Sequence, residues 1–385
     1  MTQRPPPPPP DDYYHYEEPP RRRPKRRRSI GGILVPLAVL IVILVLLFSP
    51  LGDILFSNMF GSRYPAYADF TVIRTMNLYV SNGEIEYTLD IPKPVSTTGS
   101  SGPVQVVESV VPTPSATELT EYGTTWMIWS GTTTQNVAVQ VTYDMTVYTQ
   151  IWDITTEDSG AQGDIPQSLI DSQTGDEWAI LSGSGSSTGQ YRIWPSNPQI
   201  GNLAASITTP GAPVIDNVRA IYDYLRSALS YSTGSGGSPK GCLQTLSDGM
   251  GDCDDQSIVF CSLCRAAGIP AWLVFGGLYD GSTYSWGGHA WAEVYIPLAS
   301  GGGEEVTVDI VNGEFLVRNC NRFQEWESDG VSEHLSEYYY LLSHVPTGGY
   351  PDLSVSFVED YTGAYTVSSE SVGWICGLLL APTEE

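Results

Sequence analysis

The spacing of apolar residues changes several times along the chain, and each change predicts a different element. Residues 30–48 are nineteen residues without a charge, which as a helix rising about 1.5 Å per residue nearly span a hydrocarbon core of ~30 Å. From about Phe70 to Trp152, short alternating stretches rich in Val, Thr, Tyr and Ile are separated by Gly, Ser, Pro and Asn. That pattern is typical of a β-sandwich-like domain.

The period becomes helical at Pro213. One face of the following segment is apolar, with Val214, Val218, Ile221, Tyr222, Leu225 and Leu229. A second helix is predicted from Cys253 to about Ala267, because Asp252 is a favourable N-cap and Gly268 and Pro270 follow its end. Two strands are then predicted, since apolar residues alternate over residues 289–296 and over residues 306–310.

The first half of the chain divides by composition into four parts. Residues 1–28, with few aliphatic residues, are expected to be a disordered cytoplasmic tail, and residues 29–50 a transmembrane helix. Residues 65–152 form the predicted β-rich domain, and residues 153–212, acidic and then Ser/Gly-rich, are interpreted as a connection. The proline run Pro5–Pro10 favours polyproline II and could bind an SH3-like or WW-like partner, although a solvated tail is the preferred interpretation.

Charge is distributed unevenly and predicts the orientation of the anchor. The tail holds eight basic residues against four acidic ones, and residues 21–28 are almost entirely Arg and Lys. Basic flanks stay in the cytoplasm, so the remainder of the chain is expected outside the cell, held in the membrane by residues 30–48. A cleaved signal peptide is the alternative, but the small-x-small site at residues 66–68 lies well beyond the apolar run.

The remainder of the chain is strongly acidic, with 10 basic and 39 acidic residues. Such a surface repels phosphates, and nucleic acid is therefore excluded as a partner. All six cysteines lie in this part, where disulfides can persist, but the sequence does not pair them. Cys261 and Cys264 form a C-x-x-C pattern inside the predicted helix, and we interpret them as small core residues rather than metal ligands or a redox pair.

Cys253 is the candidate nucleophile. It begins the predicted helix, where the positive end of the helix dipole and free backbone N–H groups favour a thiolate and can hold a developing oxyanion. The neighbouring Asp252, Asp254 and Asp255 oppose a low pKa, which would then depend on a basic partner.

His289 and Asp309 are the candidate partners. In residues 289–296 the alternate positions from Ala290 onward form a core face, so His289 points to the other face. Asp309 takes the same place in its own strand, opposite Val308 and Ile310. If the two strands pair, Asp309 can orient the imidazole of His289 and stabilise its charged form.

Three segments in this order resemble the transglutaminase-like superfamily. They are GMGDCDDQSIVFCSLCRAAGIPAWLVFGG, then GGHAWAEVYIP, then a strand that carries Asp, within residues 213–325. The resemblance implies an α+β class with a papain-like core, here over residues 213–350, followed by a C-terminal β segment at 351–385. It also implies that Cys253 is the nucleophile, His289 the base and Asp309 the orienting acid. No oxyanion side chain is identifiable from the sequence: Gln244 lies upstream of Cys253 and Trp286 just before His289, but neither spacing is specific.

The expected function is that of a membrane-anchored extracellular thiol enzyme acting on peptide or carboxamide bonds of a peptide or protein substrate. Hydrolysis, as by a cysteine peptidase or amidase, is preferred over acyl transfer because water is always available outside the cell. This chemistry requires no metal or organic cofactor, and no calcium loop of the EF-hand type occurs in the sequence. The alternative is a catalytically inactive cell-surface module that keeps the fold for binding or structure.

Overall fold

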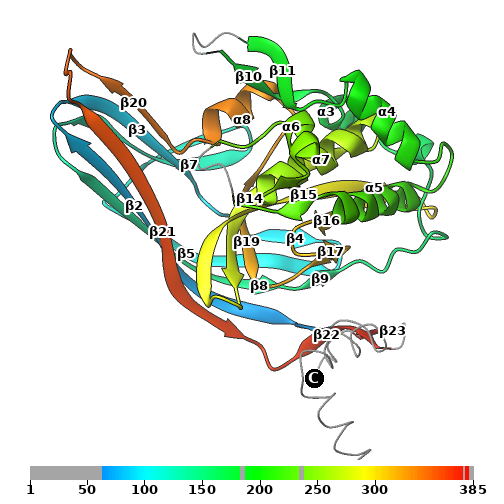
Figure 1. Ribbon diagram of the computed structural model, residues 1–385. Helices are drawn as coiled ribbons and strands as arrows, with labels where there is room; N and C mark the ends of the chain where they lie inside the picture. The colour runs from blue at the N-terminus through cyan, green and yellow to red at the C-terminus, as the bar shows by residue number, and fades with distance from the viewer. Residues whose placement is uncertain (1–62, 183–186, 234–237, 376–377, 381–385) are drawn as a thin grey trace, which may run out of the picture. The chain divides into compact units, whose positions relative to one another are not determined.

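The computed structural model describes residues 63–182, 187–233, 238–375 and 378–380 (Figure 1). The predicted tail at 1–28 and the predicted transmembrane helix at 29–50 lie outside these residues. Within the described ranges, no helix combines the length and apolar character that crossing a bilayer requires.

A five-stranded antiparallel sheet forms the centre of the core. Its strands lie in the order β17-β16-β15-β14-β19. They are β17 (Glu314–Phe315), β16 (Gly303–Asp309), β15 (Ser285–Pro297), β14 (Ala271–Asp280) and β19 (Arg322–Glu327). β14 and β19 approach so closely that a Cβ on Gly276 would lie 1.9 Å from the carbonyl oxygen of Phe323. Only glycine therefore fits at position 276 without moving the backbone.

The helix that carries Cys253 is buried in this core. α7 spans Cys253–Ala266, and its residues from Asp254 to Arg265 are buried. The side chain of Asp252 caps it by accepting from the backbone N–H of Asp255 at 3.5 Å, and Gly268 follows the helix with a φ of +73°. These are the start and stop signals that the sequence contains.

Five other α-helices are described. They are α3 (Gln167–Gln173), α4 (Pro198–Ile207), α5 (Val214–Ala228), α6 (Cys242–Asp248) and α8 (Ser332–Tyr338), with one 3₁₀ turn, η1, at Gln162–Asp164. α5 buries Val214, Val218, Ile221 and Leu225, as its apolar period predicts.

Two further antiparallel sheets, of five and four strands, form the β region. One has the order β21-β2-β8-β5-β4 and the other β20-β3-β7-β6. The strands of the first sheet are β21 (Ser354–Val367), β2 (Tyr67–Ser81), β8 (Val137–Tyr148), β5 (Gly102–Thr113) and β4 (Thr97–Gly99). Those of the second sheet are β20 (Leu342–Pro346), β3 (Ile85–Pro92), β7 (Thr124–Thr133) and β6 (Thr117–Glu121). Phe70 and Val141 of the first sheet and Leu89 and Met127 of the second belong to one buried cluster.

One three-stranded sheet and three strand pairs complete the described fold. They are β1 (Arg63–Pro65) with β22 (Ser371–Ile375) and β23 (Leu378–Leu380), β10 (Glu177–Leu181) with β11 (Ser187–Ile193), β12 (Ser230–Tyr231) with β13 (Met250–Gly251), and β9 (Gln150–Ile151) with β18 (Val317–Arg318). The fold thus contains α and β structure with mostly strands, and the predicted mixed class is confirmed at that level.

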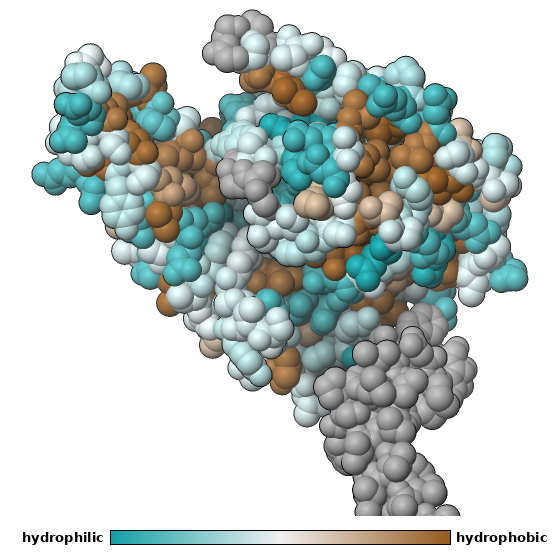
Figure 2. Space-filling model, in the orientation of Figure 1, coloured by the Kyte–Doolittle hydropathy of each residue, from teal (hydrophilic) through white to brown (hydrophobic). Residues whose placement is uncertain are grey.

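The segment 153–212 is more than the connection that its composition suggests. It contains α3, β10, β11 and α4, and Ile200 and Ala204 of α4 lie in the main core cluster. Hydrophobic residues gather on the surface over α3 and α4 (Figure 2). α4 is capped by the side chain of Asn197, which accepts from the N–H of Gln199, and Pro198 stands in its first turn. These residues are a helix-start signal, but the polar composition of the segment led to its interpretation as a connection.

The β region and the core share buried side chains. Phe70 of β2 packs against Trp286 of β15 and Phe323 of β19, with ring centroids 4.9 and 6.4 Å apart. Arg74 of β2 donates to both carboxylate oxygens of Glu325 in β19, at 2.8 and 3.0 Å. The β region and the core are thus joined through buried side chains of β2, β15 and β19.

Candidate active site

Cys253 occupies the first position of α7 and is partly exposed. The first N–H groups of a helix have no acceptor within it, so the backbone N–H groups of Cys253 and Asp254 stay available next to the thiol. The backbone N–H of Ala290 in β15 donates to the sulfur. The site thus offers backbone donors around the thiol, as stabilisation of an oxyanion requires.

The electrostatic surroundings of Cys253 favour the thiol over the thiolate. Burial raises the pKa of Cys253 well above its ordinary value, and the negative charges of Asp254 and Asp252 raise it further. The helix dipole and the imidazole lead one to expect a lowered pKa, but burial and the carboxylates outweigh them. Burial and the carboxylates thus oppose ionisation of the Cys253 thiol, and attack by this thiol would require a base.

Three carboxylates converge beside Cys253, those of Asp252, Asp254 and Asp255. Each has a structural partner: Asp252 caps α7, Asp254 accepts from the hydroxyl of Tyr339 at 2.5 Å, and Asp255 accepts from the N–H of Lys240 at 2.6 Å. Burial and a hydrogen bond to Asp254 raise the pKa of Asp252 to about 7. Their placement is explained by capping and packing.

His289 and Asp309 are brought together by the pairing of β15 with β16. Ala292 lies opposite Val308 in this antiparallel register, so His289 and Asp309 fall on the same face. Nε2 of His289 lies 2.7 Å from Oδ2 of Asp309. Because Asp309 occupies Nε2, Nδ1 is the nitrogen left to serve as base.

Asn312 completes the surroundings of this pair. Its backbone N–H donates to Oδ1 of Asp309 at 3.0 Å and its side-chain amide donates to Oδ2 at 2.8 Å. The same amide nitrogen lies 3.3 Å from Nε2 of His289. The residues after Asp309 thus hold its carboxylate in a fixed orientation.

Arg322 is a residue at this site that the sequence did not indicate. Its side chain is fully buried, and it donates to the carboxylates of Asp309 and Glu314. Burial alone would raise the pKa of Asp309. The interaction with His289, the positive charge of Arg322 and hydrogen bonds from His289 and Asn312 hold that pKa well below its ordinary value. Arg322 therefore helps to keep Asp309 ionised.

Replacing Arg322 by methionine would leave two buried carboxylates without their cation. Removing one partner of a buried ion pair costs about 3–5 kcal/mol, and we expect Arg322→Met to lower the free energy of unfolding by that amount, measured by urea denaturation. Arg322→Lys keeps the charge and should lose less. Arg219→Met is the control, since Arg219 is not buried and lies over the ring of Phe315. Equal losses for Arg219→Met and Arg322→Met would contradict this role.

Two cavities meet at Cys253, Gly288 and His289. The larger, of about 500 Å³, is also lined by Tyr231, Asp280, Ser282, Trp286, Asn312 and Asn321. The smaller, of about 250 Å³, is lined by side chains of the core and of the β region. The thiol of Cys253 thus borders both cavities.

Of the two oxyanion candidates, only Trp286 lies at these cavities. It lines the larger cavity, and its indole N–H is buried without a hydrogen-bond partner among the described residues. Gln244 is exposed on α6 and lines neither cavity. Cys261 and Cys264 are fully buried inside α7, and burial raises the pKa of Cys261 to about 12. They are core residues.

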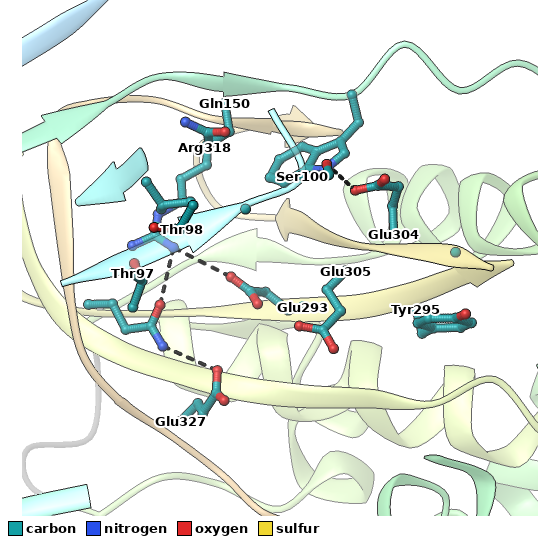
Figure 3. Close-up of a pocket in the computed structure, with 15 residues that line it drawn as sticks. Thr97, Thr98, Ser100, Gln150, Glu293, Tyr295, Glu304, Glu305, Arg318 and Glu327 are labelled. Atoms are coloured by element: carbon teal, nitrogen blue, oxygen red, sulfur yellow. Dashed lines mark hydrogen bonds and ion pairs between the residues drawn. The ribbon is translucent and has the colours of Figure 1, made fainter. Parts of the chain in front are cut away.

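A third cavity, of about 440 Å³, contains none of the candidate catalytic residues (Figure 3). Arg318 lies 3.6 Å from Glu293 and donates to Gln324 at 3.1 Å, and Gln324 donates to Glu327 (Figure 3). Arg318 and Arg322 both lie over the ring of Trp291. This cavity therefore borders the layer of buried charges behind His289 without reaching the thiol.

Comparison with known proteins agrees with the resemblance seen in the sequence. Residues 201–303 match the family model of the transglutaminase-like superfamily. The fold is similar to that of a candidate cysteine protease from Cytophaga hutchinsonii, with 15% identity and a TM-score of 0.52 over 80% of this chain and 99% of that one.

A further solved structure, the periplasmic domain of TgpA from Pseudomonas aeruginosa bound to ethylmercury, matches with 14% identity and a TM-score of 0.28 over 66% of this chain and 91% of that one. No match was found among curated proteins. The family match over residues 201–303 and the similar fold thus both relate this chain to the transglutaminase-like superfamily.

Proposed function

We propose that the protein is a thiol enzyme that hydrolyses peptide or carboxamide bonds through Cys253, His289 and Asp309. The observation that carries this proposal is that His289, which is hydrogen-bonded to Asp309, lines the same two cavities as Cys253. A nucleophile, a base and a group that orients the base are the parts that acyl transfer needs. The fold shared with a candidate cysteine protease supports the same chemistry.

The proposed reaction begins from the protonated thiol. Cys253 Sγ attacks the carbonyl carbon while Nδ1 of His289 accepts the thiol proton, and backbone N–H groups at the start of α7 stabilise the oxyanion. The C–N bond then breaks, and His289 gives its proton to the leaving amine. Water, deprotonated by His289, attacks the thioester, and the C–S bond breaks as the proton returns to the sulfur. Asp309 stabilises the imidazolium in both halves.

The test is to incubate the full-length protein with a peptide mixture and identify the products by mass spectrometry. Hydrolysis predicts new peptide ends or deamidated side chains, whereas acyl transfer predicts adducts when a primary amine is added. Products that are unaffected by blocking cysteines with iodoacetamide would refute a thiol mechanism. Absence of any product would favour the inactive binding module.

We further propose that residues 30–48 anchor the protein in the cell membrane, with the tail inside and the core outside. The basic run before the apolar segment supports this orientation. The two antiparallel sheets of the β region, which also take in β20 and β21 from after the core, would then be the β-sandwich-like domain.

This topology predicts a result in intact cells. A protease added outside should degrade the chain beyond about residue 60, because that part is exposed, while a tag at residue 1 stays protected by the membrane. Permeabilised cells, in which the tag should also be lost, are the control. Cleavage of the tag in intact cells, or a mature protein that begins near Asp69, would overturn the anchor.

A further inference from the structure

The smaller of the two cavities at Cys253, which we call the aromatic cavity, is built by two parts of the chain. Phe275, Trp326 and Tyr339 of the core line it, and β21 of the β region supplies Glu359 and Tyr361. The rings of Phe275 and Trp326 stack at 4.6 Å, and Tyr339 meets Phe275 edge to face at 5.8 Å. The walls therefore present aromatic rings beside the thiol.

The charge of the aromatic cavity is negative. Its one arginine, Arg74, is already paired: it donates to both oxygens of Glu325 and, at 2.5 Å, to Glu359. Glu359 keeps 28% of its side chain exposed, whereas Arg74 and Glu325 are each 4% exposed. Asp254 is the third carboxylate in the lining. One cation thus faces three carboxylates, and the accessible charge is that of Glu359.

Aromatic rings together with carboxylates form an environment that binds ammonium and guanidinium groups. The volume of about 250 Å³ is below that of pockets for drug-sized ligands and suits a single side chain. An acidic side chain in this cavity would meet uncompensated carboxylates in a partly dry site, where like charges repel strongly.

We propose that the aromatic cavity selects substrates that carry a lysine or arginine side chain next to the carbonyl attacked by Cys253. This inference rests on the proposed function, because it assigns the substrate class of the same site. Glu359 is the specificity-determining residue, since it is the accessible carboxylate, and Arg74 is the residue that positions it.

The charge of the cavity can be tested without a substrate. Methanethiosulfonates of similar size, one with a trimethylammonium group and one with a sulfonate group, would be reacted with the full-length protein, and modification of Cys253 followed by peptide mapping. Each rate is divided by the rate of the same reagent with a small free thiol, because a cationic reagent reacts faster than an anionic one with any thiolate. On this scale we expect the cationic reagent to react about tenfold faster or more. Glu359→Gln should reduce that ratio several-fold, whereas Glu118→Gln should not, because Glu118 pairs with Lys93 on the surface of the β region.

Equal rates for the two reagents, a faster anionic reagent, or a thiol that reacts with neither would overturn the inference. These outcomes do not depend on turnover, so failure of the proposed function is recognised separately, as absence of any hydrolysis.

The second arm uses peptides that differ only at the residue before the scissile bond. We expect kcat/KM to fall about tenfold or more from arginine or lysine to norleucine, and further to glutamate. Glu359→Gln should reduce the difference in kcat/KM between the arginine and norleucine peptides, and Glu118→Gln should leave that difference unchanged. A different result would be a preference for lysine but not for arginine, together with the formation of amine adducts. It would show that the cavity binds the amine acceptor, and it would contradict the proposal that the cavity binds a side chain next to the attacked carbonyl.

Discussion

Replacing Cys253 by alanine is expected to reduce peptide hydrolysis by about 10⁶-fold, to the residual rate that binding and oxyanion stabilisation alone support. The reason is that no covalent thioester can form once the sulfur is absent. The measurement is kcat on any peptide that the wild-type protein cleaves, with the full-length chain in both cases.

Cys264→Ala is the matched control for the loss of a thiol. Cys264 is fully buried in the same helix, so its replacement should lower stability slightly and leave kcat within a few-fold of wild type. A Cys253→Ala protein that keeps more than about a tenth of the wild-type rate would mean that another group is the nucleophile.

The second large effect is expected from Asp309→Asn. In a serine-protease triad the same change leaves the geometry intact and lowers kcat by about 10⁴-fold, because the imidazole adopts the wrong tautomer. Here a neutral amide at position 309 would face Nε2 of His289, and the imidazolium formed during attack would lose its counter-charge. We therefore expect a loss of similar size in kcat, with KM nearly unchanged.

Asn312→Ala is the control for this second prediction. It removes one donor to Asp309 but keeps the carboxylate, so a loss of about tenfold or less is expected. Because Asp309 also accepts from Arg322, the unfolding midpoint of each variant should be measured to separate loss of fold from loss of catalysis. A folded Asp309→Asn protein with kcat within tenfold of wild type would refute the orienting role.

The features that the sequence predicted correctly are those with local signals. The cap at Asp252, the stop at Gly268 and the alternation around His289 each lie within a few residues of the element that they define. The sequence alone therefore places Cys253 at a helix start and His289 on a strand face. The apolar face of α5 was predictable for the same reason.

The features that were missed depend on contacts between distant parts of the chain. β21 pairs with β2 along its length, from Ala68 opposite Val367 to Ser81 opposite Ser354, so the last long strand adjoins the first (Figure 1). The alternation of apolar and polar residues within a strand does not show which other strand it pairs with. Arg322 and Glu359 likewise acquire their roles only after folding, because their partners are remote in sequence or on another strand.

The protonation state of Cys253 shows where a local rule was outweighed. A helix N-terminus lowers the pKa of a thiol, and the sequence contains that feature. Burial and the neighbouring carboxylates act in the opposite direction and raise the pKa of Cys253. Burial cannot be predicted from the sequence around one residue. In the proposed mechanism His289 consequently acts as a general base on a thiol.

The most direct test of the central claim, that Cys253 carries the reaction, is to follow its alkylation and peptide hydrolysis in the same sample. The full-length protein would be treated with iodoacetamide, and the modified fraction of each cysteine compared with the remaining kcat over time. We predict that Cys253 reacts faster than the buried Cys261 and Cys264, and that activity falls in proportion to its modification. Hydrolysis that persists at the wild-type rate after complete modification of Cys253 would contradict the claim.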